Sequence, residues 1–96
     1  MTIEHDATAR RFLLRHPDGT GALTYSDFAP GVLDFEHVEV APALRGRGLA
    51  AQLVEAACRH ARQTGAGVIP SCPYVAWWFR QHPEQQDLLA PIGRGS

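Results

Sequence analysis

The sequence predicts an α/β fold with a mixed, mainly antiparallel sheet and two helices. Three β-rich segments separated by turn residues lie within 11–40. A helical apolar pattern follows over 47–64, and a short apolar strand and a second helical segment come after it. Hairpin strands followed by a helix and another strand are typical of a mixed sheet. The 96 residues are expected to form one domain over 1–96, with a core over about 10–90.

The first three strand candidates are 11–15, 22–25 and 32–40. The segment His16-Pro17-Asp18-Gly19 separates the first two, and Pro30-Gly31 precedes the third. Asp and Gly tolerate the positive φ angles of tight hairpin turns. The order therefore predicts consecutive antiparallel hairpins.

The third strand candidate changes phase along its length. Leu33, Phe35 and His37 share one face by the two-residue period of a strand. Val38 and Val40 fall on the other face. Either both faces are partly buried, or a β-bulge near His37 resets the alternation.

A long amphipathic helix is predicted over 47–64, ending at Gly65, a residue suited to the left-handed position after a helix. Its apolar stripe repeats every fourth residue, at Leu49, Leu53, Ala57 and Ala61.

A short buried strand at 68–69 and a second helix over 74–81 complete the predicted fold. The His82-Pro83 pair ends this helix, because the residue before a proline is pushed out of the helical region. Trp77 and Trp78 are adjacent, so they must point to different sides of the helix.

The composition is that of a soluble globule, with 45% hydrophobic and 20% charged residues and a net charge of −1. This charge does not favour nucleic acid as a partner. No apolar run approaches the roughly 20 residues of a membrane span, and no secretory signal is visible, so a cytoplasmic location is expected. We therefore expect Cys58 and Cys72 to be free thiols. Residues 1–9 are expected to be frayed, and 93–96 to form a loose tail.

The segment Arg45-Gly46-Arg47-Gly48 is the most informative motif of the chain. It lies between the end of the third strand and the start of the long helix. Glycines there allow close approach of a ligand, and the helix start offers unpaired N–H groups and a positive dipole end. With two arginines in the same turn, the segment predicts a site for a di-anion such as pyrophosphate.

At these residues the chain resembles the GNAT family of acetyl-CoA-dependent N-acetyltransferases, whose pyrophosphate loop reads Arg/Gln-x-x-Gly-x-Gly/Ala. Arg45, Gly48 and Ala50 fill the motif positions. The segment 68–74 (Val-Ile-Pro-Ser-Cys-Pro-Tyr) and His82-Pro83-Glu84 resemble a compact subgroup of that family. The resemblance implies a sheet that splays at the strand receiving the cofactor, and no metal.

The resemblance also implies roles for individual residues. The pantetheine arm of acetyl-CoA would pair with the backbone of the third strand, and the pyrophosphate would lie on the loop and helix start. The implied cofactor-binding residues are Val38, Val40, Arg45, Gly46, Arg47, Gly48, Leu49 and Ala50.

The catalytic candidates are His37, Cys72 and Tyr74. An imidazole titrates near neutral pH, so His37 could be the general base, with Glu36 and Glu39 as alternatives. Cys72 is either a core cysteine or a thiol beside the acetyl group, and even a transient acyl acceptor. Tyr74 is either a core cap or, by the family pattern, the acid that protonates the departing CoA thiolate.

The function implied is transfer of an acetyl group from acetyl-CoA to the amine of a small molecule, peptide or protein. Alternatives are a non-catalytic CoA-binding module, a phosphate-binding regulatory domain, and a glycine-rich turn that binds nothing. The loose dinucleotide fingerprint over 46–51 is disfavoured, because the next strand ends in Ile69-Pro70-Ser71-Cys72 without the acidic residue that binds a ribose.

Overall fold

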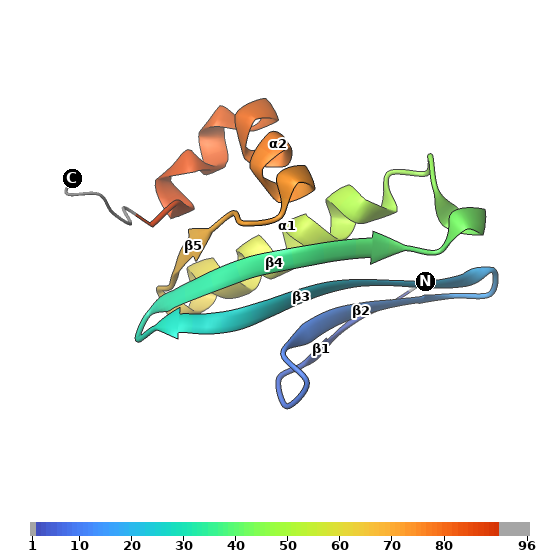
Figure 1. Cartoon of the computed structure of the whole chain (residues 1–96), viewed down its shortest axis with the longest axis horizontal. Helices are drawn as coiled ribbons and strands as arrows, with labels where there is room; N and C mark the ends of the chain where they lie inside the picture. The colour runs from blue at the N-terminus through green and yellow to red at the C-terminus, as the bar shows by residue number, and fades with distance from the viewer. Residues whose placement is uncertain (1, 91–96) are drawn as a thin grey trace.

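A computed structural model describes residues 2–90 of the chain, so the tail predicted at 93–96 lies outside the described residues. It shows one five-stranded sheet in the order β1-β2-β3-β4-β5, and Figure 1 shows helix α1 behind this sheet and α2 beside β4 and β5. The first four strands pair antiparallel, and β4 pairs with β5 in parallel. The predicted mixed, mainly antiparallel α/β fold is confirmed.

The strands follow the predicted order, with one addition at the N-terminus. Their bounds are β1 Thr2–Asp6, β2 Arg11–His16, β3 Gly19–Ala29, β4 Val32–Val40 and β5 Gly67–Ile69. Pro17-Asp18 and Pro30-Gly31 form the two tight turns, since His16 pairs with Gly19 and Ala29 with Val32. Gly31 has φ 77°, a conformation that favours glycine.

Strand β1 contradicts the prediction that residues 1–9 are frayed. It pairs along its whole length with β2, from Thr2 opposite Arg15 to Asp6 opposite Arg11. The ring of His5 stacks on Phe12 with centroids 4.3 Å apart and contacts the Tyr25 hydroxyl at 2.5 Å. The segment has little apolar character of its own, so its order depends on backbone pairing with β2, on His5 and on Ile3, which packs against the core.

The phase change in β4 is a β-bulge. Tyr25 pairs with Phe35 and Thr24 pairs with His37, so Glu36 is an extra residue in β4. The core side of the strand therefore shifts from Leu33 and Phe35, which are buried, to Val38 and Val40, which are partly buried and pack against the core. The bulge alternative of the sequence analysis is thus confirmed.

Two α-helices and two short 3₁₀ segments connect and cover the strands, with bounds Pro42–Leu44 (3₁₀), α1 Leu49–Thr64, α2 Pro73–Gln81 and Pro83–Leu88 (3₁₀). Helix α1 begins at Leu49 rather than at the predicted Arg47, because Gly48 precedes it in the left-handed region with φ 74°. Gly65 ends it with φ 74° as predicted. Trp78 is buried and Trp77 is 45% exposed, as expected for adjacent residues of one helix.

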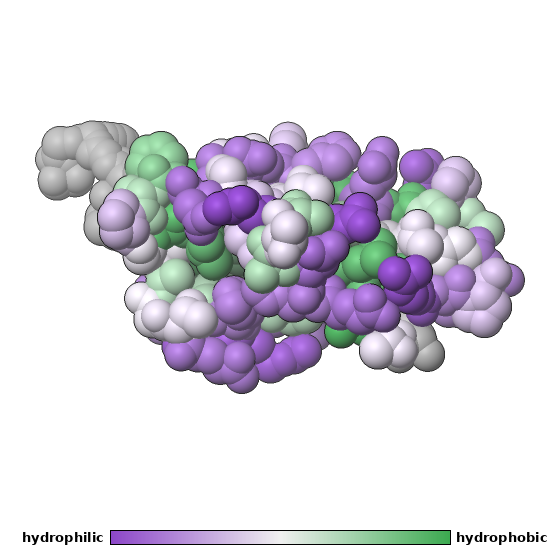
Figure 2. All heavy atoms as spheres, turned by 90° about the horizontal axis from the view of Figure 1, so that it is seen from below, coloured by the Kyte–Doolittle hydropathy of each residue, from purple (hydrophilic) through white to green (hydrophobic). Residues whose placement is uncertain are grey.

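The buried side chains form one core between the sheet and the helices. Its largest fully buried members are Trp78, Phe35, Phe79, Leu14, Leu23, Leu44, Leu53, Val54, Val68 and Val75. Polar residues dominate the outer surface near β1, as Figure 2 shows from below the view of Figure 1. Within residues 2–90, no helix has the length and apolar character needed to cross a membrane.

The sheet splays between β4 and β5. Only Val32, Leu33 and Asp34 of β4 pair with β5. The chain then turns away from the sheet into α2. At this point the Cys72 N–H donates a backbone hydrogen bond of 3.1 Å to the Phe35 carbonyl of β4.

We predict that His5 makes folding stability depend on mildly acidic pH. Its pKa is lowered from the ordinary value by burial first and then by His60, against a smaller opposing effect of Asp6. A depressed folded pKa means that this stability is complete above about pH 6.5 and is lost as pH falls through the folded value. When the pH is lowered from about 7.5 to about 5.5, the melting temperature should fall further in the wild type than in His5→Gln. This variant keeps a polar group near Tyr25.

The matched control is His37→Gln, because the side chain of His37 is 61% exposed. That variant should keep the wild-type pH dependence. Equal losses in the wild type and in His5→Gln would show that His5 does not couple protons to folding.

Candidate functional site

The splay leaves the second half of β4 with a free main-chain edge. The Ala41 N–H donates to the Thr20 carbonyl at 2.9 Å, which makes this pair a hydrogen-bonded one. In an antiparallel ladder such pairs alternate with non-hydrogen-bonded ones, so Val40 opposite Gly21 and Val38 opposite Leu23 belong to the second kind. The N–H and C=O groups of Val38 and Val40 therefore point away from β3, toward the gap beside β5.

The loop after β4 presents unpaired donors at the end of this edge. Gly46 and Gly48 have φ angles of 81° and 74°, which only glycine adopts without strain. A Cβ at either position would meet no atom within 4 Å, so the space over them is open. No side chain caps α1 and its first turn holds no acidic residue, so the first N–H groups from Leu49 onward keep the positive end of the helix dipole uncompensated.

A cavity of about 210 Å³ joins these groups. It opens between the end of β4, the loop, the first turn of α1 and the start of α2. Its lining comprises Val40, Leu44, Arg45, Gly46, Gly48, Leu49, Ala50 and Tyr74. Six of the eight predicted cofactor-binding residues thus lie around one hollow, and the exceptions are Val38 and Arg47.

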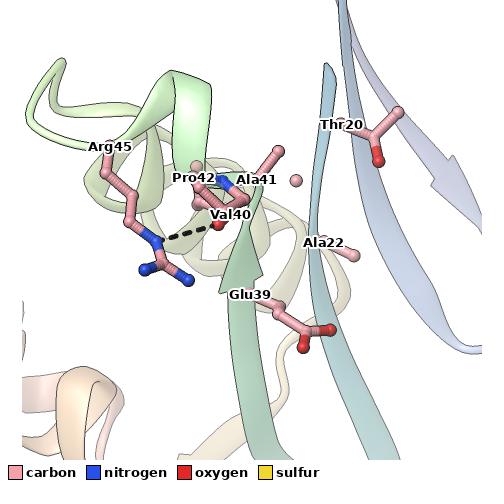
Figure 3. A pocket seen from close by; sticks show the side chains of 8 residues that line it. Thr20, Ala22, Glu39, Val40, Ala41, Pro42 and Arg45 are labelled. Atoms are coloured by element: carbon pink, nitrogen blue, oxygen red, sulfur yellow. Dashed lines mark hydrogen bonds between the residues drawn. The ribbon is translucent and has the colours of Figure 1, made fainter.

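The two arginines of the loop hold different positions. The Nε of Arg45 donates to the Val40 carbonyl oxygen at 3.3 Å, and Figure 3 shows its side chain reaching back to the end of β4. Arg47 lies 3.6 Å from the carboxylate of Asp18 in the β2–β3 turn. Asp18 was not predicted as a site residue, because only the fold brings the hairpin turn to this loop.

Tyr74 of α2 lines the same cavity as the glycine loop. Its ring is partly buried, and it packs near Trp77 with centroids 5.6 Å apart. Burial first and then the negative charge of Glu55 raise the pKa of the Tyr74 hydroxyl above its ordinary value. The hydroxyl is therefore protonated at neutral pH, as a proton donor must be.

His37 and Cys72 do not line this cavity. His37 follows the bulge and is 61% exposed, with its Nε2 3.9 Å from the Glu39 carboxylate. Cys72 is only 6% exposed at the start of α2, where its N–H donates to Phe35. Of the three catalytic candidates, the structure thus places Tyr74 alone at the loop cavity.

Both cysteines are free thiols, as predicted. Cys58 lies in the core stripe of α1 at 3% exposure, and burial raises the pKa of its thiol to about 12. The cavity also includes Leu44, which sequence reasoning missed. Its signal was a large apolar side chain among the small residues, glycines and arginines of the loop between β4 and α1.

Comparison with known proteins agrees with this geometry. The family model described as GCN5-related N-acetyl-transferase matches residues 11–88. This match spans most of the chain, which therefore belongs to the GCN5-related N-acetyltransferase family, as the resemblance indicated.

Curated relatives and a solved structure extend the comparison. The chain is 30% identical over 90 residues to Protein NATD1 of Gallus gallus, covering 92% of this chain and 82% of that protein. Protein NATD1 of Homo sapiens is also 30% identical over 90 residues, with 92% and 80% covered. A GCN5-like protein from Staphylococcus aureus, solved by NMR, shares the fold with a TM-score of 0.75 at 20% identity, covering 97% of this chain and 91% of that one.

We predict that both thiols react slowly in the folded protein and that Cys58 is the slower. The thiolate is the reactive form, and a pKa of about 12 leaves very little of it near pH 8. In Cys72→Ala, alkylation of Cys58 should be at least about 100-fold slower than in the denatured chain. Mass spectrometry of iodoacetamide-treated samples measures both rates, and Cys58→Ala isolates Cys72. Labelling of Cys58 ahead of Cys72 would contradict the burial of Cys58 in the α1 stripe.

Proposed function

We propose that this protein binds acetyl-CoA and transfers its acetyl group to an amine. One observation carries the proposal: the free edge of β4 leads directly to an uncapped helix start with open space over two glycines. An extended chain with amide groups can pair with the edge at Val38 and Val40, and a di-anion can lie on the helix start. Acetyl-CoA carries both parts in one molecule.

The loop residues would hold the pyrophosphate. The N–H groups from Gly46 to Ala50 supply donors, and the glycines leave room for phosphate oxygens. Arg45 supplies a positive charge within the same cavity, and Arg47 adds a second one nearby. Arginine suits this role because its planar fork matches phosphate oxygens.

The thioester supplies the activated acetyl group, and the chain supplies proton transfer around it. We assign Tyr74 as the acid that protonates the departing thiolate, supported by its place on the cavity and by its raised pKa. Strand N–H groups would stabilise the oxyanion that forms on the carbonyl. His37 remains the proposed base, since it lies on β4 next to the bulge at Glu36.

A non-catalytic CoA-binding module is the second candidate. The exposure of His37 and the burial of Cys72 favour it, because neither side chain lines the loop cavity. Release of free CoA in the presence of amines separates the two functions. Turnover supports transfer, whereas binding without turnover with any of a panel of primary amines supports the module.

We predict that Ala50→Glu abolishes acetyl-CoA binding without destabilising the fold. Ala50 is in the first turn of α1 and lines the cavity, so a carboxylate there would repel the pyrophosphate. The same carboxylate interacts favourably with the helix dipole, by about 0.3–1 kcal/mol. Wild-type protein should gain about 2.7 kcal/mol of stability at a ligand concentration 100 times its Kd. The variant should melt at or above the wild-type temperature and show no acetyl-CoA shift.

Gln63→Glu is the matched control, because it makes the same charge change at the exposed far end of α1. It should keep the acetyl-CoA shift and lose a little stability, since a negative charge near a helix C-terminus is unfavourable. A full shift in folded Ala50→Glu would refute the pyrophosphate assignment.

We also predict that His37→Gln lowers turnover by roughly 10²-fold or more, the lower range for removal of a general base. Acetyl-CoA affinity should stay near the wild-type value, because the His37 side chain is not part of the loop cavity. Glu36→Gln and Glu39→Gln, measured beside it, show which of the three groups is the base. Full activity in His37→Gln would transfer the role to a carboxylate or a water.

A further inference from the structure

Arg45 occupies the last free main-chain acceptor of β4. Its Nε–H donates to the Val40 carbonyl, and that carbonyl points toward the gap beside β5 rather than toward β3. This is the position at which an extended ligand would form its hydrogen bond with the end of the strand. Arg45 therefore competes with such a ligand in the arrangement that the structure shows.

The same side chain lies at the boundary of two hollows. It lines the 210 Å³ cavity of the glycine loop. It also lines a second cavity of about 250 Å³ beside the start of β3 and the end of β4. Figure 3 shows Thr20 and Glu39 on the far side of Val40 from Arg45. The residue is exposed, so packing does not lock the guanidinium in place.

A phosphate is a stronger partner for Arg45 than the Val40 carbonyl. A phosphate adds the attraction of opposite charges to the hydrogen bond, and the guanidinium can bind it through two parallel N–H bonds. The bond to Val40 is long at 3.3 Å and involves a neutral acceptor. An anion on the glycine loop would therefore reorient the planar guanidinium and release the carbonyl.

We propose that Arg45 is a latch that couples the two halves of the ligand. In one position it covers the Val40 carbonyl. In the other it binds the pyrophosphate and leaves the carbonyl free for the pantetheine arm. The inference rests on the proposed acetyl-CoA site and adds to it a selection rule: thioesters that carry a pyrophosphate are favoured over short thioesters that lack one. Because coupling is reciprocal, each half of the ligand must strengthen the binding of the other.

The test separates the two halves. S-acetyl-pantetheine and inorganic pyrophosphate are titrated by calorimetry, alone and together. In the wild type, saturating pyrophosphate should raise the affinity for S-acetyl-pantetheine about threefold or more. This is the change in affinity that one additional hydrogen bond is expected to give. In Arg45→Met, S-acetyl-pantetheine alone should bind at least as tightly as it does to pyrophosphate-saturated wild type. Pyrophosphate should add nothing in that variant, and acetyl-CoA should bind about tenfold more weakly through loss of the charged contact.

Arg47→Met is the matched control, because it removes the same charge from the same loop while leaving Val40 covered. It should retain the coupling between pyrophosphate and S-acetyl-pantetheine. A readout independent of any thioester is the exchange of the Arg45 Nε–H with water, followed by NMR. It should be slower than that of Arg59, which makes no side-chain hydrogen bond within the described part of the chain.

The failures are distinguishable. If acetyl-CoA does not bind the wild type, the proposed function is wrong. If Arg45 and Arg59 exchange equally fast, the latch is wrong whatever binds. Weaker binding of S-acetyl-pantetheine to Arg45→Met would also overturn the latch, because the side chain would then support the arm instead of competing with it.

Discussion

The early end of the pairing between β4 and β5 is the constraint on which the rest of the site depends. Three residues of β4 pair with β5, and the ladder between the two strands ends at Asp34 and Ile69. The bond from Cys72 to Phe35 marks the point where the chain leaves the sheet. From there to Val40, the strand is supported by β3 on one side only. An edge that most proteins cover or shorten is kept here beside a helix start.

The β-bulge at Glu36 makes this unpaired stretch compatible with a packed core. Without the extra residue, Val38 and Val40 would continue the alternation on the outer face, and His37 would point into the core. With it, the two valines pack against the core and their main-chain groups still face the gap. Bulges are frequent near functional sites for this reason, since they re-aim side chains without ending the strand.

The place of the proposed anion site follows from the connection between β4 and β5. The long helix that makes this connection must start where β4 ends, so its free N–H groups lie at the end of the free edge. Gly46 and Gly48 allow the chain to turn into the helix without a capping side chain. Two arginines then connect the loop to its surroundings. Arg45 donates a hydrogen bond to the Val40 carbonyl of the sheet, and Arg47 pairs with Asp18 of the neighbouring hairpin turn. Chain connectivity therefore brings a free strand edge next to an uncapped helix start, which is the combination on which the proposed acetyl-CoA site rests.

The sequence by itself determined the class of fold, the order of the elements from β2 onward and the position of the glycine loop before α1. These features depend on local rules: period-two and 3.6-residue apolar patterns, Pro-Gly and Asp-Gly turns, and glycines before a helix. It also limited the phase change in β4 to two explanations, one of which is the bulge. Only the tertiary structure decided which chemical groups share a site. Strand β1 escaped prediction because its order comes from pairing with β2 and from His5 against Phe12, Tyr25 and His60. Other features also depend on the folded arrangement of the chain. They are the contact of Asp18 with Arg47, the burial of Cys72 and the hydrogen bond from Arg45 to Val40. Such contacts depend on how elements pack in three dimensions, and no local pattern in the sequence encodes that packing.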